Sequence, residues 1–291
     1  MKRAAVILAM LSIAGWAEAQ STGQPAQQTP PAAGQAAPTP GATTPPVGKR
    51  PPQAKTDPEL AAWKAAAANT DPAALEKAAD EFATKFPDSE LRVLLYQSAM
   101  RSYQNANNAE KTEAMARKVL SLDPDNPEAL ALVAEVIANR TRDSDIDKDQ
   151  RFAEGTTMAQ KAIQTVDTDI SVPAGTPQEK IDAYKALLRS NAYSTLGIIE
   201  FKKDNFSGAA DYFQKSIDVY PSDPDPWVVL RLALTLDKEA KYPEALKVAN
   251  HAVELAKDNT AILTPAKREV ERLQQLTGAP VAAQPQTPPK N

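Results

Sequence analysis

Residues 193–230 read YSTLGIIEFKKDNFSGAADYFQKSIDVYPSDPDPWVVL. Apolar residues recur in this stretch at helical spacing in two runs, separated by the polar turn KKDN and closed by a proline-rich turn. The stretch therefore predicts two short helices joined by a tight turn. Trp227 and Leu230 then follow Tyr193 and Leu196 at an interval of 34 residues, which predicts that the helix pair is a repeat.

An earlier part of the chain has the same period. Tyr96, Ala99 and Tyr103 return 34 residues later as Leu130, Val133 and Ile137. The pattern is an aromatic residue and Leu-Gly on the first helix, then an aromatic, a small and an aromatic residue on the second, then a closing proline. It is carried by Tyr193, Leu196, Gly197, Phe206, Ala209, Phe213, Ile217 and Pro221. This order resembles the tetratricopeptide repeat (TPR), and Lys85–Ser89 looks like repeats of exported bacterial envelope proteins.

The resemblance implies an all-α, right-handed superhelical solenoid of about four repeats over residues 57–277. Small residues such as Gly197, Ala209 and Ala252 should let neighbouring helices approach closely. Large residues, namely Phe213, Trp227 and Leu230, should fill the space between repeats. Because repeats bury their apolar faces only by stacking, residues 260–276 should form a polar-faced cap. Its apolar side should consist of Ala261, Leu263, Val270 and Leu273.

The pattern is irregular over residues 140–190. The second helix of that repeat is delayed to residues 152–166, an insertion follows over 167–177, and residues 178–189 continue as helix into the next repeat. We therefore expect a distorted superhelix or two sub-arrays. Asp57-Pro58 and Asp71-Pro72 should begin the first two helices, with Asp as the N-cap.

The N-terminus has the features of a signal peptide over residues 1–19. A basic start at Lys2 and Arg3 precedes an apolar stretch over 4–17, and Ala17-Glu18-Ala19 predicts cleavage before Gln20. We expect export to the periplasm of a Gram-negative bacterium or secretion, with no stable membrane anchor after cleavage. An uncleaved anchor is the alternative, although the stretch is shorter than the roughly 20 residues of a spanning helix.

Most of the 25 prolines lie near the two ends of the chain. Residues 20–56 should form a disordered linker and residues 278–291 a disordered tail, because such segments lack apolar area to offset the entropy of ordering. A net charge of −4 gives no basic excess for a nucleic-acid partner. There is no cysteine and one histidine, His251, and no phosphate-binding loop or nucleophile motif, so we expect neither an enzyme nor a cofactor.

The TPR resemblance implies that a protein or peptide partner binds the concave face formed by the first helix of each repeat. The residues it assigns to that face are Gln97, Arg101, Gln104, Asn105, Glu135, Asn139, Asn191, Ser194, Ile198, Phe201 and Lys202. Ile198 and Phe201 fit equally well as core residues between repeats. The proposed activity is that of an interaction scaffold, and the alternative is an accessory subunit of an envelope complex.

A calcium-responsive scaffold is a further alternative. Asp143, Asp145, Asp147 and Glu154 match the ligand spacing of an EF-hand loop. Lys148, however, stands where that loop needs glycine, and a solvated acidic loop explains the same residues. We therefore expect no metal site.

Overall fold

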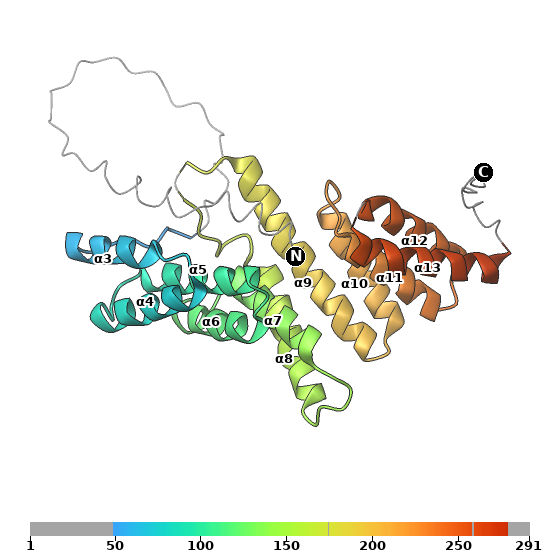
Figure 1. The fold of residues 1–291 in the computed structure, drawn as a ribbon, viewed down its shortest axis with the longest axis horizontal. Helices are drawn as coiled ribbons and strands as arrows, with labels where there is room; N and C mark the ends of the chain where they lie inside the picture. The colour runs from blue at the N-terminus through green and yellow to red at the C-terminus, as the bar shows by residue number, and fades with distance from the viewer. Residues whose placement is uncertain (1–48, 174, 258, 279–291) are drawn as a thin grey trace, which may run out of the picture. The chain divides into compact units, whose positions relative to one another are not determined.

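The computed structural model describes residues 49–173, 175–257 and 259–278, and the parts of the chain it describes contain helices and no strands (Figure 1). The expected all-α fold is therefore confirmed, and the predicted signal peptide and most of both Pro-rich segments lie outside the described residues. The helices are α3 Asp57–Ala67, α4 Pro72–Lys85, α5 Arg92–Asn105, α6 Ala109–Leu122, α7 Pro127–Arg140, α8 Lys148–Thr165, α9 Gln178–Lys202, α10 Phe206–Val219, α11 Pro226–Lys238, α12 Tyr242–Ala256 and α13 Thr260–Thr277.

The chain forms two compact units. Among the described residues, unit 1 contains residues 49–136 together with those of Lys161–Leu188, and unit 2 contains Ile137–Gln160 and those of residues 189–278. Helices α7, α8 and α9 each contribute residues to both units. The sequence predicted either a distorted superhelix or two sub-arrays over residues 140–190. Two of the three boundaries, after Gln160 and after Leu188, lie in that range, and the third, after Val136, precedes it. The delayed helix α8 begins at Lys148, four residues earlier than predicted, and the long helix α9 begins at Gln178 as predicted.

The turns between paired helices repeat the same geometry, which is direct structural support for a repeat. In each turn one residue has a positive φ and the next N–H returns to the carbonyl five residues earlier, as in a helix C-cap that reverses the chain. The residues with positive φ are Asn107 (55°), Asp204 (58°) and Ala240 (57°). The hydrogen bonds are Asn108 N to Tyr103 O at 3.0 Å, Asn205 N to Glu200 O at 2.9 Å and Lys241 N to Leu236 O at 2.9 Å.

The starts of the first two helices agree with the sequence to within one residue. Asp71 caps α4 by accepting the N–H of Ala74 at 2.8 Å, as expected. The first helix differs, because its N-cap is Thr56, which accepts the N–H of Glu59, and Asp57 is already helical. The threonine hydroxyl performs the capping that the sequence assigned to the aspartate.

Unit 1 is held together by two rungs of polar contacts that join α4, α5 and α6. The Tyr103 hydroxyl donates to Glu76 at 2.5 Å, and Lys111 binds the same carboxylate at 3.0 Å. The Tyr96 hydroxyl donates to Asp80 at 2.8 Å, where Lys118 binds at 2.6 Å. Each lysine ammonium also lies over the ring of the tyrosine in its own rung. Each rung therefore provides hydrogen-bond partners for a tyrosine hydroxyl, a carboxylate and an ammonium group that come from three different helices.

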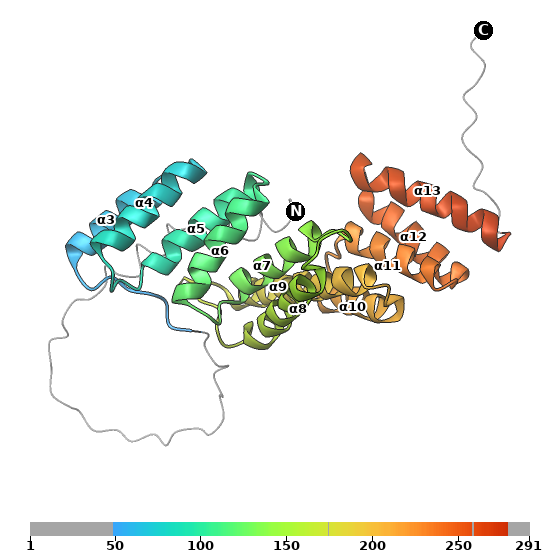
Figure 2. The same cartoon turned by 90° about the horizontal axis from the view of Figure 1, so that it is seen from below.

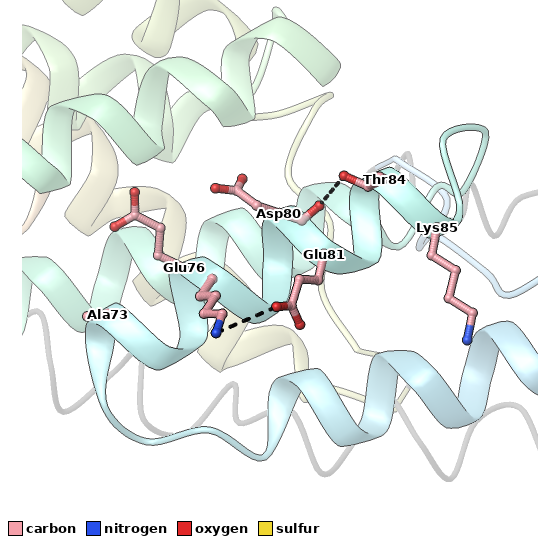
Figure 3. A pocket seen from close by; sticks show the side chains of 7 residues that line it. Ala73, Glu76, Asp80, Glu81, Thr84 and Lys85 are labelled. Atoms are coloured by element: carbon pink, nitrogen blue, oxygen red, sulfur yellow. Dashed lines mark hydrogen bonds and ion pairs between the residues drawn. The ribbon is translucent and has the colours of Figure 1, made fainter.

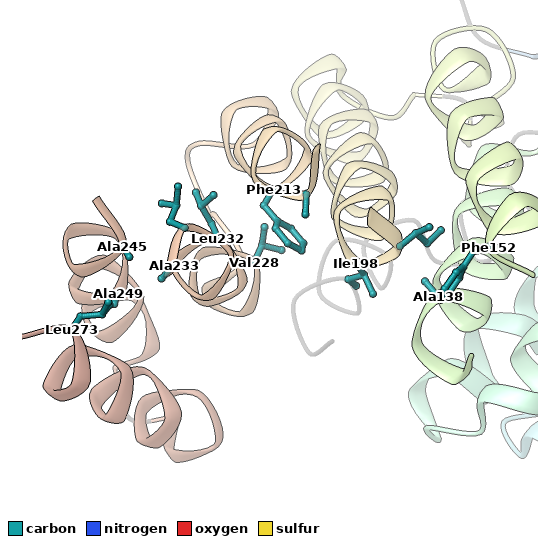
Figure 4. Packing of buried hydrophobic residues seen from close by; sticks show 13 residues of the cluster. Ala138, Phe152, Ile198, Phe213, Val228, Leu232, Ala233, Ala245, Ala249 and Leu273 are labelled. Carbon is teal, nitrogen blue, oxygen red and sulfur yellow. The ribbon is translucent and has the colours of Figure 1, made fainter. Parts of the chain in front are cut away.

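The core of unit 2 contains small residues at close helix contacts and large residues between them (Figure 4). A Cβ added at Gly197 would lie 2.6 Å from the ring of Phe213, which itself is 1% exposed. Leu230 is also buried, at 2% exposed. The expectation that Trp227 fills the same space is wrong, because it is 38% exposed.

The terminal helix α13 packs on α12 and α11, and Figures 1 and 2 show these three helices side by side. It buries Ile262, Ala266 and Leu273, whereas Ala261 is exposed. Of the predicted apolar side, Leu273 is buried and Leu263 and Val270 are partly buried. The cap is therefore confirmed. At its start, Ile262 is buried in place of the predicted Ala261.

Residues 49–56 correct the predicted linker. They belong to the range 20–56 that the sequence assigned to a disordered spacer, but the side chains of Lys49, Arg50 and Lys55 bind residues of unit 1. These charged side chains were expected to be solvated, but they hold residues 49–56 against unit 1. Within the described residues, no helix is both long and apolar enough to cross a membrane.

Candidate partner-binding surface

In unit 1, the expected binding residue Arg101 is engaged by the chain itself. Its guanidinium donates to Glu128 of α7 at 2.7 and 2.6 Å. Tyr184 of α9, which is 3% exposed, interacts with both groups. Burial lowers the pKa of Arg101, but the Glu128 carboxylate outweighs burial and raises it. Burial and Glu128 also raise the pKa of Tyr184 well above its usual range. The three side chains form a closed polar network.

The neighbouring candidates of unit 1 differ in exposure. Gln97 is buried at 9% exposed, and Gln104 is partly buried. Asn105 is exposed at the end of α5, and Glu135 of α7 is half-buried. The start of α9 forms an apolar cluster with the preceding connection, made of Val166, Ile170, Tyr184 and Leu188 with Val172 and Ile181 at its margin. A partner carboxylate that replaced Glu128 on Arg101 would have to break the two hydrogen bonds between them.

In unit 2, Lys202 completes the end of a helix. Its ammonium donates to the carbonyls of Ala138 at 2.7 Å and Thr141 at 2.8 Å, with Asn139 at 3.4 Å. These carbonyls lie at the C-terminus of α7, where helical partners are lacking and a cation is favourable. Burial lowers the pKa of Lys202. This lysine therefore has a structural role in the fold.

The other candidates of unit 2 are mostly packed. Ile198 is a core residue at 8% exposed, and Ser194 is buried at 9%. Phe201 is half-buried and contacts Phe206 edge to face, with ring centroids 5.4 Å apart. Asn191 is half-buried, and Asn139 is exposed. The core interpretation of Ile198 is confirmed, and binding by the exposed candidates stays a prediction.

The sequence missed an apolar surface on α11. Trp227 and Leu234 are 38% and 37% exposed, and a spacing of seven residues places them two turns apart on one helix face. Arg231 and Lys238 occupy the same face by the same spacing. We call these four residues the α11 stripe. The opposite side of the helix, with Val229, Leu230, Ala233 and Leu236, packs in the two apolar clusters of unit 2.

Positive charge accompanies the apolar groups of the stripe. Arg231 lies close enough to Lys202 to oppose its protonation. Arg272 on α13 is neutralised locally, because Glu269 and Asp237 bind it, and these hydrogen bonds raise its pKa above the usual range. Exposed Lys238 has no such neutralisation among the ion pairs of the described residues. The stripe thus offers an indole ring and a leucine beside cationic side chains.

Two shallow hollows elsewhere contain less distinctive chemistry. One, of about 580 Å³, follows the exposed face of α4, where Glu76, Lys77, Asp80 and Glu81 lie along a single helix (Figure 3). The other, of about 530 Å³, lies between α10 and α12 above Leu232 and Leu236. Its rim is formed by Asp211, Gln214, Lys241, Glu244, Lys247 and the exposed His251. These rims are mixed charges on solvated helix faces.

The acidic loop between α7 and α8 is partly neutralised by basic neighbours. Lys148 lies 3.7 Å from Asp143, and Arg151 lies 3.8 Å from Asp145. Asp145 also accepts the N–H of Arg142 at 2.9 Å. In the described ranges, no group of three or more acidic, histidine or cysteine residues is arranged to hold a metal ion. Lys148, which stands where an EF-hand needs glycine, contributes its ammonium to the loop instead.

Comparisons with known proteins give likenesses of fold only. No protein-family model matches the chain, and no curated protein matches it. Among solved structures, a thermophilic TPR protein of Thermus thermophilus is 12% identical, with a TM-score of 0.45, over 73% of this chain and 99% of that one. An assembly chaperone of RpL4 is 12% identical, with a TM-score of 0.40, over 76% and 95%. At this level of similarity, neither protein indicates a partner for this chain.

Proposed function

We propose that this protein is a non-catalytic interaction scaffold and that the α11 stripe is its partner-binding surface. The single observation that supports this most strongly is the exposure of Trp227 and Leu234 on one helix face. Tryptophan and arginine are enriched among the residues that dominate binding energy at protein interfaces. The stripe combines both residue types in unit 2.

The chemistry of the stripe defines the partner. The indole of Trp227 and the side chain of Leu234 would pack against an apolar side chain. Exposed Lys238 would attract a carboxylate next to it. The ligand that fits is therefore a peptide segment with one or two apolar residues flanked by Asp or Glu.

The size of the exposed apolar surface favours a short segment over a permanent subunit contact. In the described ranges, the exposed large apolar residues are Ile146, Trp227, Leu234 and Leu276, and two of them share a helix face. Obligate interfaces are larger and more apolar than this. The accessory-subunit alternative is therefore less well supported than a transient peptide reader.

Export is part of the proposal and depends on the first nineteen residues, which lie outside the described part. Basic Lys2 and Arg3, the apolar stretch and the Ala17-Glu18-Ala19 site support secretion. Mass spectrometry of the protein from a periplasmic fraction should find Gln20 as its N-terminus. An intact Met1 in a cytoplasmic fraction would contradict this part of the proposal.

A displayed library of random peptides, selected on the chain from Gln20 onward, tests the binding surface. The proposal expects selected peptides that combine apolar residues with Asp or Glu. A Trp227→Ala, Leu234→Ala double variant should lose them. Leu276→Ala, which removes an exposed leucine from α13, is the matched control and should retain them. Selection of peptides that bind both variants equally would place the binding surface elsewhere.

A further inference from the structure

We propose that one edge of unit 1 is a second binding surface, built for an extended basic peptide that contains proline, and that residues 49–55 are its resident ligand. The peptide, KRPPQAK, is called the arm. The edge consists of Asp88 and Glu90 in the turn before α5 and Asp123 in the turn before α7, and is called the turn edge. Figure 2 shows the arm, in blue, leading into α3.

Glu90 binds both the side chain and the backbone of the arm. The Arg50 guanidinium donates to its two carboxylate oxygens, each at 2.8 Å, and the backbone N–H of Gln53 donates to one of them at 3.2 Å. The hydrogen bond from Arg50 lowers the pKa of Glu90, so the carboxylate is ionised at neutral pH. Both hydrogen bonds come from one guanidinium nitrogen, Nη2, and a charge-assisted hydrogen bond is roughly twice as strong as a neutral one. Glu90 therefore recognises an arginine followed by an extended backbone.

The two ends of the arm bind separate parts of the edge. Lys49 forms an ion pair with Asp123, and the Lys55 ammonium donates to the carbonyl of Asp88 at 2.7 Å. These lysines are about six residues apart, a distance of about 20 Å in an extended chain. The spacing of the two turns therefore selects an extended peptide with a basic residue near each end.

Proline suits the middle of such a ligand. Pro51 and Pro52 are half-buried, and consecutive prolines hold an extended conformation before binding. The ligand thus loses little conformational freedom when it docks. Individual exposed ion pairs contribute little, so the specificity of the turn edge comes from several contacts held at fixed spacing.

The arm is covalently tethered to its own site, so its effective concentration there is high. A separate peptide must displace it, and the turn edge is masked until a stronger or multivalent basic ligand arrives. This surface lies in unit 1 and shares no residue with the α11 stripe. An experiment that disproves binding at the turn edge therefore leaves the proposed function unaffected.

The test uses the full chain with Lys49→Ala, Arg50→Ala and Lys55→Ala, which releases the arm. The probe is a fluorescein-labelled peptide of residues 48–56, followed by fluorescence anisotropy. The released chain should bind it at least tenfold more tightly than the unaltered chain, in which the tethered arm competes. Equal affinity for the two chains would overturn the proposal.

A carboxylate pair tests specificity in the released chain. Glu90→Gln should weaken binding at least tenfold, because it removes the negative charge and one of the two oxygens that accept from Arg50. Glu81→Gln removes an exposed carboxylate of α4 whose ion-pair partner is Lys77 on the same helix, and should leave the affinity unchanged. If both changes weaken binding equally, the attraction is general charge and the proposal is wrong. The melting temperature of each variant confirms that it is folded.

Discussion

The guanidinium of Arg101 on α5 binds the carboxylate of Glu128 on α7 through two hydrogen bonds, at 2.7 and 2.6 Å. Glu128 is almost fully buried, with 5% of its side chain exposed, so the pair joins two repeats from inside the unit. Removing one partner of such a pair leaves a charge without compensation. A residue that the repeat pattern assigned to partner binding is therefore part of the folded structure.

Arg101→Ala should accordingly destabilise the chain. We expect a loss of about 2–3 kcal/mol, at the low end for a broken buried ion pair because the arginine is partly exposed. Asn105→Ala, one turn later and exposed, should change stability by less than about 0.5 kcal/mol. Urea unfolding followed by circular dichroism measures both. If the two variants unfold at the same urea concentration, the network has no structural role.

Gly197→Ala should destabilise unit 2. The new Cβ would lie 2.6 Å from the ring of Phe213, which has no room to move. Overpacking of this kind costs about 1–3 kcal/mol. A Gly197→Ala, Phe213→Leu double variant should be more stable than the sum of the single changes predicts, since the smaller side chain makes space. Simple additivity in thermal unfolding would show that the two residues do not touch.

Ala240→Gly should stabilise the chain. Ala240 has a φ of 57°, a conformation that costs an L-residue roughly 1–2 kcal/mol and glycine almost nothing. After the greater flexibility of glycine in the unfolded chain is subtracted, we expect a gain of about 0.5 kcal/mol. Ala114→Gly, at an exposed position inside α6, is the control and should lose about 1 kcal/mol. A lower melting temperature for Ala240→Gly would contradict the turn geometry.

The tyrosine of one polar rung should make stability fall at alkaline pH. Burial and the hydrogen bond to Glu76 raise the pKa of Tyr103 to about 12, against about 10 in the unfolded chain. Between these values the unfolded chain loses the proton and the folded chain keeps it, so unfolding becomes easier as pH rises. The stabilisation that Tyr103 contributes is complete below about pH 10 and declines toward pH 12.

Unfolding by urea at about pH 8 and about pH 11 measures this effect. Tyr103→Phe removes the ionising hydroxyl and should lose less stability between the two pH values than the unaltered chain. The opposite rung also contains a tyrosine, Tyr96, whose pKa is raised by burial and by Asp80. Tyr96→Phe should therefore also reduce the pH dependence, and it does not serve as the control. An unchanged dependence in Tyr103→Phe would contradict the prediction.

The helices and their order could be predicted because the signals are local. Asp71-Pro72 marks a helix start by itself, and the interval between Tyr193 and Trp227 marks the repeat. The side of α11 that is buried could not be predicted, because the helix has two apolar sides. Val228 and Leu232 lie on one side, and Trp227 and Leu234 lie on another. Contacts with neighbouring helices decide which side is buried. The 34-residue repeat pattern assumes that equivalent positions are buried in every repeat. In α11 this fails, because Trp227 is exposed.

The candidate site was harder to predict for a related reason. The pattern indicates that Arg101 and Lys202 are polar residues on a first helix, but not that Glu128 and the last carbonyls of α7 lie within reach. Those partners are distant in sequence. The arm was missed because its proline-rich composition is typical of disorder, whereas Arg50 and Lys55 find acceptors supplied by the fold.

Fluorescence of Trp227 tests the central claim most directly. In the chain from Gln20 onward the tryptophans are Trp63 and Trp227, and Trp63 is 3% exposed. A selected peptide with apolar and acidic residues should shift the emission to shorter wavelength and protect it from acrylamide. Trp227→Phe gives the fluorescence that comes from Trp63 alone. Leu234→Ala should weaken the affinity for the peptide about tenfold, as expected for a central interface residue. A peptide that binds without changing the Trp227 signal, and equally well to Leu234→Ala, would contradict the account.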